Sequence, residues 1–168
     1  NTDGAFGRKP NAPTNWMGVS VYQPLPQQFE AGGIMTLGST EVETSGVSLI
    51  NDMSAITSST ASVYLARKKV LSPKDRVIFS VTQPHRVEAG SANIAVPQVY
   101  ERGGNLVFDN TKVGLSPSGR QLDFEARYQI SANDNSELSF GAVVSRDYGH
   151  VANAKLEKQG FLTYRLKW

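Results

Sequence analysis

Hydrophobic and polar residues alternate along most of this chain, most clearly between residues 121 and 130. There, one set of side chains is apolar and the intervening set is polar: Leu122, Phe124, Ala126, Tyr128 and Ile130 against Gln121, Asp123, Glu125, Arg127 and Gln129. A period of two is typical of a β-strand, whose successive side chains point to opposite faces. The same period recurs over 17–21, 29–37, 76–82, 138–145 and 162–168, and more weakly near 47–50, 61–69, 87–96 and 105–113. The pattern predicts an all-β protein, an antiparallel meander.

The segments between these runs suggest the domain limits. Residues 132–136 read Ala-Asn-Asp-Asn-Ser, which predicts a hairpin between the strands on either side. Residues 1–14 are rich in Gly, Pro and Asn without periodicity, which indicates a linker or flexible N-terminus. We expect residues 15–168 to form a single antiparallel β-domain, with the irregular stretch 98–119 as a long loop.

Alternation of this kind fits two architectures. In a soluble antiparallel β-sandwich, the apolar faces of two sheets pack against each other. In a transmembrane β-barrel, the apolar faces point to lipid and the polar faces line a wet lumen. Two features favour a barrel, or the C-terminal part of one. First, the last strand ends on an aromatic residue, Trp168. Second, some small residues suit the lumen side of a barrel: Gly18, Ser20, Gly32 and Gly141. Aromatic residues near strand ends suit its interfacial girdles: Trp16, Tyr22, Phe161 and Trp168.

Composition narrows the classes of function. The net charge of the 168 residues is only +2, too small to predict nucleic-acid binding. The chain has no Cys, which excludes disulfides and thiol catalysis, and no run of about 18 apolar residues that would make a transmembrane helix. Since it begins with Asn1, we expect a processed or excised piece whose export signal lay upstream.

Candidate chemistry is sparse. Only His85 and His150 could act as general bases, and two His residues without a third spaced ligand make a poor metal site. Residues 147–150 (Asp-Tyr-Gly-His) are typical of a turn that leaves a strand. We therefore predict no catalytic residue, no cofactor and no metal. The densest basic run, 67–69 with Lys74 and Arg76, is interpreted as a solvated strand end and turn, with phosphate or lipid-headgroup binding as the less favoured alternative.

Three ordered segments carry a resemblance to a known family. Residues 82–97 (TQPHRVEAG running on to IAVP) resemble an SQPLRVxSG…LxLP pattern, 115–125 (LSPSGRQLDFE) resemble LxPxGRELDLE, and 145–154 (SRDYGHVANA) resemble RRDPGHVAxA. Followed by a short strand with an aromatic last residue, they resemble the C-terminal translocator region of subtilisin-like serine protease autotransporters. Tyr148 stands where that pattern has Pro, and His85 where it has Leu. Barrels of that family usually have twelve strands, whereas this length gives about eight at roughly 20 residues per strand and turn.

The resemblance implies a non-catalytic outer-membrane β-barrel that assists surface export of a subtilisin-like protease passenger. Its partners would be outer-membrane lipid, the barrel-assembly machinery and the passenger, and its location the bacterial outer membrane. The alternative is a soluble β-sandwich accessory or interaction domain of a secreted or cell-surface subtilisin-like protease. In either case, the protease activity would belong to another part of the parent polypeptide.

Two groups of residues are candidates for a functional role. The first is a set of lumen-facing polar residues, for which ordinary cross-strand ion pairs on a solvated sheet are the alternative interpretation: Asp123, Glu125, Arg127, Arg165 and Lys167. The second is a C-terminal assembly signal formed by Tyr164, Leu166 and Trp168, expected by analogy with outer-membrane proteins. Its alternative is hydrophobic packing at a domain edge.

Overall fold

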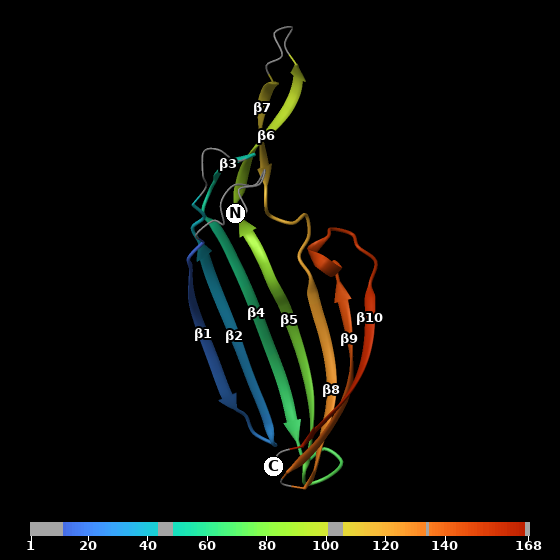
Figure 1. Cartoon of the computed structure of the whole chain (residues 1–168). Helices are drawn as coiled ribbons and strands as arrows, with labels where there is room; N and C mark the ends of the chain where they lie inside the picture. The colour runs from blue at the N-terminus through green and yellow to red at the C-terminus, as the bar shows by residue number, and fades with distance from the viewer. Residues whose placement is uncertain (1–11, 44–48, 101–105, 134, 167–168) are drawn as a thin grey trace. The chain divides into compact units, whose positions relative to one another are not determined.

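The structure is a computed structural model, and it describes residues 12–43, 49–100, 106–133 and 135–166. In these residues the chain forms ten strands (Figure 1): β1 (Thr14–Pro24), β2 (Phe29–Thr40), β3 (Ile50–Met53), β4 (Ile56–Lys68), β5 (Asp75–Ala89), β6 (Ser91–Tyr100), β7 (Leu106–Gly114), β8 (Leu122–Asn133), β9 (Ser136–Arg146) and β10 (Glu157–Leu166). A short 3₁₀ helix, η1 (Tyr148–His150), lies between β9 and β10. The predicted all-β fold is confirmed. No helix among the described residues has the length and hydropathy needed to cross a membrane.

The strands form two sheets. Seven of them lie side by side in the order β1-β2-β4-β5-β8-β9-β10, and the other three form a sheet in the order β3-β6-β7 (Figure 1). The pairs β5–β8, β8–β9, β9–β10, β3–β6 and β6–β7 are antiparallel, as predicted. In the larger sheet, the end strands β1 and β10 do not pair with each other, so the described residues form an open sheet and not a closed barrel. A complete barrel is thus not what these residues form.

Most of the predicted strands are present, with one clear correction. The hairpin predicted at 132–136 is confirmed, because Asn133 of β8 pairs with Ser136 of β9. The long loop predicted at 98–119 is wrong over most of its length, since β6 extends to Tyr100 and residues 106–114 form β7. The weak strand predicted near 105–113 is confirmed as β7. Asn, Thr and Lys residues weaken its alternation, and its pairing with β6 supplies the backbone hydrogen bonds of a strand.

The chain divides into two compact units. The first comprises residues 1–17, 37–59 and 87–117, and the second comprises 18–36, 60–86 and 118–168. The three-stranded sheet belongs to the first unit, and the site described below belongs to the second. Of the predicted N-terminal linker 1–14, the first eleven residues lie outside the described part of the chain, and Thr14 already belongs to β1. The prediction of one domain over 15–168 stays a prediction.

Burial in this fold is the reverse of that in a water-soluble core. Among the described residues, the only buried hydrophobic side chains are Ala66 and Ala92. Nine polar or charged residues in the described ranges are buried: Glu30, Ser58, Ser59, Asp75, Gln121, Gln129, Ser136, Ser139 and Ser145. Large apolar side chains of the seven-stranded sheet are exposed instead, including Phe124 at 46%, Phe140 at 50% and Leu162 at 73%. A β-sandwich would enclose these apolar side chains between two layers.

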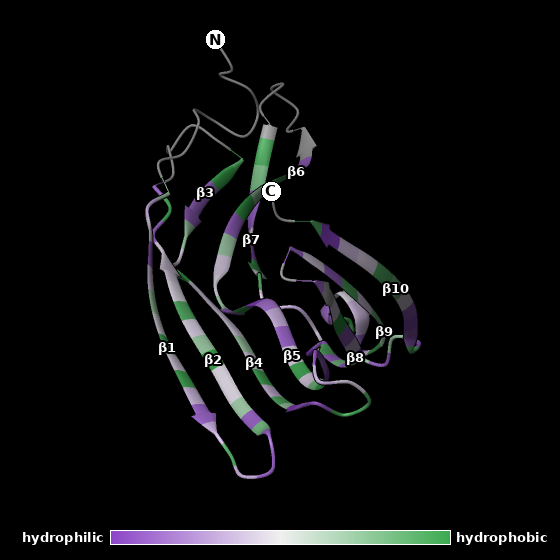
Figure 2. Ribbon diagram, turned by 90° about the horizontal axis from the view of Figure 1, so that it is seen from below, coloured by the Kyte–Doolittle hydropathy of each residue, from purple (hydrophilic) through white to green (hydrophobic). Residues whose placement is uncertain are grey.

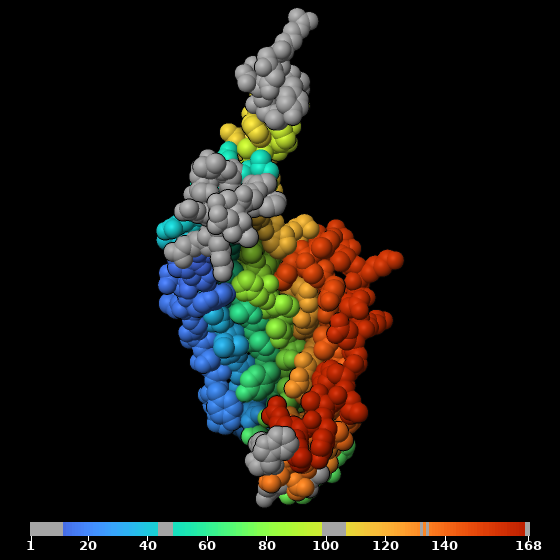
Figure 3. Space-filling model, in the orientation of Figure 1, coloured from blue at the N-terminus to red at the C-terminus, as the bar shows by residue number. Residues whose placement is uncertain are grey.

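The figures show the same arrangement. Hydrophobic and hydrophilic residues follow one another along β1 and β10, as the period of two requires (Figure 2). In the space-filling view, the side chains of β1, β2, β4 and β5 lie at the surface without another element over them (Figure 3). The alternation seen in the sequence therefore separates two faces of one sheet.

Candidate functional site

The strand registers define two faces on β5, β8, β9 and β10. Residues directly opposite each other in an antiparallel ladder share a face. One row on the first face runs from Arg76 through Gln129 and Ser139 to Thr163. We call the face that carries this row the polar face. The next row along each strand lies on the other side, the apolar face, and consists of Val77, Tyr128, Phe140 and Leu162.

The two faces differ sharply in exposure. Gln129 and Ser139 on the polar face are 8% and 6% exposed, whereas the neighbouring Phe140 on the apolar face is half exposed. A buried polar side chain is stable only when it is hydrogen-bonded. The polar face meets this requirement, since no buried side-chain nitrogen or oxygen lacks a hydrogen-bond partner among the described residues.

A chain of polar contacts crosses five strands of this face. The Tyr22 hydroxyl of β1 donates to Glu30 Oε2 of β2 at 3.2 Å, and Lys68 Nζ of β4 lies 2.6 Å from the same oxygen. Arg76 of β5 approaches Glu30 Oε1 at 3.6 Å and donates from Nε to Gln129 Oε1 of β8 at 2.8 Å. We call these five residues, with Ser139 and Thr163 that continue the row on β9 and β10, the polar belt.

Glu30 is the centre of the polar belt. It is only 6% exposed, and its carboxylate receives two cations and one hydroxyl. Such a buried carboxylate is tolerated because it is both paired and hydrogen-bonded. This cluster could not be predicted from the sequence, because its members lie far apart along the chain and the register that joins β2, β4 and β5 cannot be deduced from alternation alone.

Three of the five predicted lumen-facing residues lie together on the polar face of β8. Gln121 Nε2 donates to Asp123 Oδ1 at 2.8 Å, and Arg127 Nε donates to Glu125 Oε1 at 2.6 Å. Both contacts thus join residues two positions apart along the chain. Arg165 lies on β10 opposite Glu137 of β9 and is exposed. Lys167 lies outside the described residues.

Aromatic rings cover glycines in this sheet. An added methyl group at Gly32 would come within 2.5 Å of the Tyr64 ring, and one at Gly38 would come within 2.6 Å of the Trp16 ring. The Phe161 ring lies against Gly141 in the same way, and Arg127 stacks over that ring, 5.1 Å from its centroid. The glycines leave room for rings from neighbouring strands, a device that compensates for weak glycine positions in sheets.

Three of the aromatic residues expected in interfacial girdles have other roles here. The Tyr22 hydroxyl belongs to the polar belt, Trp16 lies over Gly38, and Phe161 shares the polar-face row of Arg127 and Gly141. Their assignment to a girdle that faces lipid is wrong for Tyr22 and Phe161, because both point to the polar face. The period of two places Tyr22 on the same side of the strand as Gly18 and Ser20, and this signal could have predicted that Tyr22 points to the polar face.

The three segments that carry the family resemblance meet at one junction. His150 Nδ1 accepts a hydrogen bond from the Gln121 backbone N–H at 3.0 Å, and its Nε2 lies 3.0 Å from the backbone oxygen of His85. The Gly119 N–H donates to the backbone oxygen of His150 at 2.7 Å, and Arg86 Nε donates to that of Gly119 at 2.9 Å. Residues near 85, 120 and 150 are thus held together by hydrogen bonds.

This geometry defines the role of His150. Since Nδ1 accepts a backbone N–H, the proton of the neutral ring is on Nε2, which donates to a carbonyl. Both ring nitrogens are therefore occupied by the backbone, so His150 acts as a structural link and is not placed as a general base. The predicted turn at 147–150 is present, with positive φ at Asp147, Gly149 and His150, but the Asp147 side chain accepts from the Asn153 N–H and does not cap η1.

The predicted C-terminal signal is described in part. Tyr164 and Leu166 lie on β10 with more than half of each side chain exposed, and Tyr164 pairs with Leu138. Trp168 lies outside the described residues. Within the part of the chain that the structure describes, no three His, Cys, Asp or Glu side chains gather in an arrangement that could hold a metal ion.

The comparisons with known proteins leave the family open. No protein-family model, no curated protein and no solved structure matches this chain. The resemblance to subtilisin-like autotransporters thus stays a prediction that rests on the three sequence segments.

Proposed function

We propose that the seven-stranded sheet is part of an outer-membrane β-barrel, and that the chain is the C-terminal translocator region of an autotransporter with a subtilisin-like protease passenger. The observation that carries the membrane part of this proposal is the reversed burial. Polar side chains such as Glu30, Gln129 and Ser139 are enclosed, while Phe79, Phe124 and Leu162 are exposed.

The energetics favour lipid around the apolar face. Fully burying one large apolar side chain away from water stabilises a protein by roughly 1.5–3 kcal/mol. A water-soluble fold would forgo that gain at every exposed position of β5, β8, β9 and β10, whereas hydrocarbon around the sheet supplies it. Contiguous apolar surface of this kind marks a binding or membrane surface.

The polar face supports the second half of the proposal. In a barrel, the face opposite lipid lines a lumen that holds water and polar groups. The polar belt supplies charged and hydrogen-bonding side chains from seven strands to that space. An extended polypeptide can cross such a space without losing the hydration of its backbone. The passenger itself enters the proposal from the sequence resemblance alone.

The outer edges of the end strands, β1 and β10, must also be accounted for in a membrane barrel. In hydrocarbon, each unpaired backbone N–H or C=O costs several kcal/mol, so membrane sheets close on themselves. In the proposed barrel, the edges of β1 and β10 therefore pair with further strands. These strands would belong to a longer polypeptide or to another copy of the chain.

Adjacent residues on β10 provide the sharpest test. Leu162 and Thr163 are both exposed, follow one another on β10, and point to opposite faces. Because the chain has no Cys, a single Cys at either position can be labelled with a fluorophore without background. The polypeptide that carries these residues is folded into vesicles, once with Leu162→Cys and once with Thr163→Cys.

The two probes have opposite expected results. A label at 162 is quenched by lipids with brominated acyl chains and shielded from aqueous iodide, and a label at 163 shows the reverse. If iodide quenches both labels and brominated lipid quenches neither, the apolar face is in water and the membrane assignment fails.

A further inference from the structure

A hollow on the polar face is lined by residues of β5, β8, β9 and β10, and its volume is about 380 Å³. Two carboxylates, a buried hydroxyl, an amide and two side chains with apolar surface are among the groups in its wall: Asp123, Glu125, Ser145, Gln159, Val143 and Tyr148. We call this site the carboxylate pocket, because its charged residues are Asp123 and Glu125.

The strand register brings these residues together. Asp123 of β8 lies opposite Ser145 of β9, and Glu125 lies opposite Val143, which pairs in turn with Gln159 of β10. Both rows are an even number of residues away from the polar belt along each strand. Since side chains alternate between the two faces, the pocket lies on the polar face.

The two carboxylates differ in how they are neutralised. Glu125 Oε1 accepts a hydrogen bond from Arg127 Nε at 2.6 Å, and the Arg127 guanidinium also stacks over the Phe161 ring. Asp123 accepts a hydrogen bond from Gln121 Nε2 at 2.8 Å, and it forms no ion pair with any described residue. None of the described residues that line the pocket is basic, so the pocket keeps a negative charge.

Ser145 is an independent sign of a ligand. The residue is 3% exposed, yet its hydroxyl forms no hydrogen bond within the described part of the chain. Among the described residues, every completely enclosed side-chain nitrogen or oxygen has a partner, so the Ser145 oxygen is open to a space. That space is the carboxylate pocket, which Ser145 lines. A hydroxyl in this place can accept a hydrogen bond from a group that enters the pocket.

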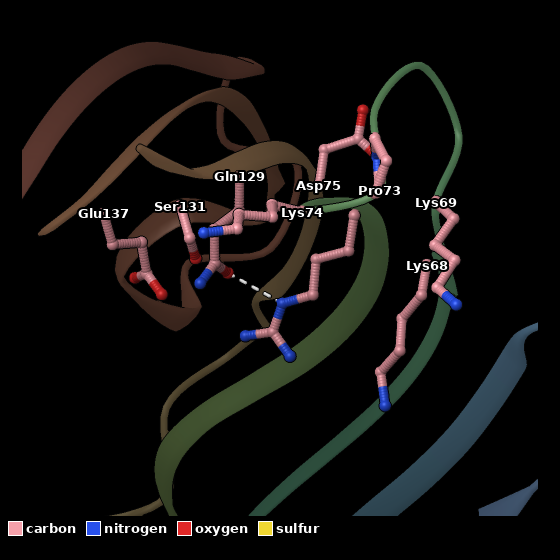
Figure 4. A pocket seen from close by; sticks show the side chains of 9 residues that line it. Lys68, Lys69, Pro73, Lys74, Asp75, Gln129, Ser131 and Glu137 are labelled. Atoms are coloured by element: carbon pink, nitrogen blue, oxygen red, sulfur yellow. Dashed lines mark hydrogen bonds between the residues drawn. The ribbon is translucent and has the colours of Figure 1, made fainter. Parts of the chain in front are cut away.

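A second hollow, further along the polar face, differs in its charges. At the end of β4 and the start of β5, Lys68 and Lys69 line the same space as Asp75 and Glu137 (Figure 4). The chain itself thus supplies both cations and carboxylates to that hollow. The wall of the carboxylate pocket has only the carboxylates, and Asp123 can therefore accept a cation from outside the described residues.

The lining indicates which cation fits. The space is larger than a single ion fills, and no three His, Cys, Asp or Glu side chains of the described ranges gather in an arrangement that could hold a metal ion. Val143 and Tyr148 offer apolar and aromatic surface, on which methylene groups and a guanidinium pack. Carboxylates bind guanidinium groups through charge-assisted hydrogen bonds. An arginine side chain combines all of these features.

We propose that the carboxylate pocket binds the guanidinium group of an arginine on an extended polypeptide segment. The guanidinium donates to Asp123 and Ser145, and its methylene groups pack on Val143. This inference rests on the proposed function, in which such a segment passes along the polar face. It adds the chemistry by which the sheet recognises that segment.

The test uses the whole polypeptide, folded in a non-ionic detergent, and a fluorescent peptide of six arginines whose binding is followed by anisotropy. Asp123→Asn removes the charge but keeps an oxygen that can accept from Gln121, so the fold should be unaffected. Asp109→Asn makes the same change at an exposed site on β7 and serves as the control. We expect Asp123→Asn to weaken peptide binding roughly fivefold and Asp109→Asn to leave it unchanged.

Two further measurements test the geometry of the pocket. Ser145→Ala removes the hydroxyl with little change in volume and should weaken binding about twofold, because one hydrogen bond to the guanidinium is lost. The six-arginine peptide should bind more tightly than a six-lysine peptide, since an ammonium group has no planar fork of donors and stacks less well on Tyr148.

Several results would overturn the proposal. These are an equal loss in Asp123→Asn and Asp109→Asn, equal binding of the two peptides, or displacement of the six-arginine peptide by spermidine or calcium chloride at the same concentration. The Cys probes at 162 and 163 report on the proposed function separately. Binding that depends on Asp123 with both probes in water would reject the membrane barrel alone. Lipid quenching at 162 with binding that does not depend on Asp123 would reject the pocket alone.

Discussion

The two faces of β8, β9 and β10 belong to the same strands, yet they differ in the polarity and the exposure of their side chains. On the apolar face, Tyr128 and Phe140 stack with ring centroids 5.3 Å apart, and Phe140 remains half exposed. On the polar face, the adjacent Gln129 and Ser139 are almost completely enclosed. One residue along the strand thus changes both the polarity and the burial of the side chain. In these strands the apolar side chains are thus the exposed ones, and their polar neighbours are the enclosed ones.

The largest expected effect comes from placing a charge on each face in turn. Phe79 and Ser80 are neighbours on β5, and the register puts Phe79 opposite Ala126 and Ser80 opposite Glu125. In vesicles, Phe79→Arg should destabilise the folded protein by about 2–4 kcal/mol if it lies near the bilayer midplane, because an arginine there enters hydrocarbon. Ser80→Arg should cost less than about 1 kcal/mol. Urea unfolding of both variants measures the difference, and equal losses would contradict the assignment of the faces.

Much of this comparison could be predicted from the sequence. The alternation at 121–130 separated Phe124 from Glu125 correctly, because side-chain direction in a strand depends only on the period of two. The turn residues at 132–136 predicted the hairpin between β8 and β9. What the period does not specify is which face meets solvent, and the sequence alone therefore left the barrel and the sandwich open.

The contacts that could not be predicted from the sequence have a common physical origin. Glu30, Lys68 and Arg76 come together through the register of three strands, and register depends on pairing between distant segments. The contact between Gly141 and Phe161 arises in the same way. Residues 106–114 show only a weak alternation, which predicts a strand near 105–113 but does not exclude a loop, and their pairing with β6 decides for the strand. The local pattern along the chain predicts where strands lie, whereas contacts between strands depend on how distant segments pair in the sheet.

A smaller effect should separate two glycines of the β9–β10 pair. A methyl group at Gly141 would overlap the Ala126 carbonyl oxygen and the Phe161 ring, whereas one at Gly160 would find its nearest neighbour at 3.9 Å. We expect Gly141→Ala to lower the free energy of unfolding by about 2 kcal/mol, because the overlap forces the sheet or the ring to shift. Gly160→Ala should change it by less than about 0.5 kcal/mol. Denaturant unfolding measures both, and a similar stability for the two variants would mean that Phe161 does not pack on Gly141.

The smallest effect concerns the centre of the polar belt. Glu30→Gln keeps the shape of the side chain but removes the negative charge that Lys68 and Arg76 share. Since both cations are more than one third exposed, the loss should be only about 1 kcal/mol, and it should shrink at high salt. Glu41→Gln makes the same charge change at an exposed site and serves as the control. Urea titrations at low and high salt distinguish the two variants. A Glu30→Gln variant as stable as the control would mean that the polar belt depends on hydrogen bonds such as Arg76 to Gln129, and not on the carboxylate at its centre.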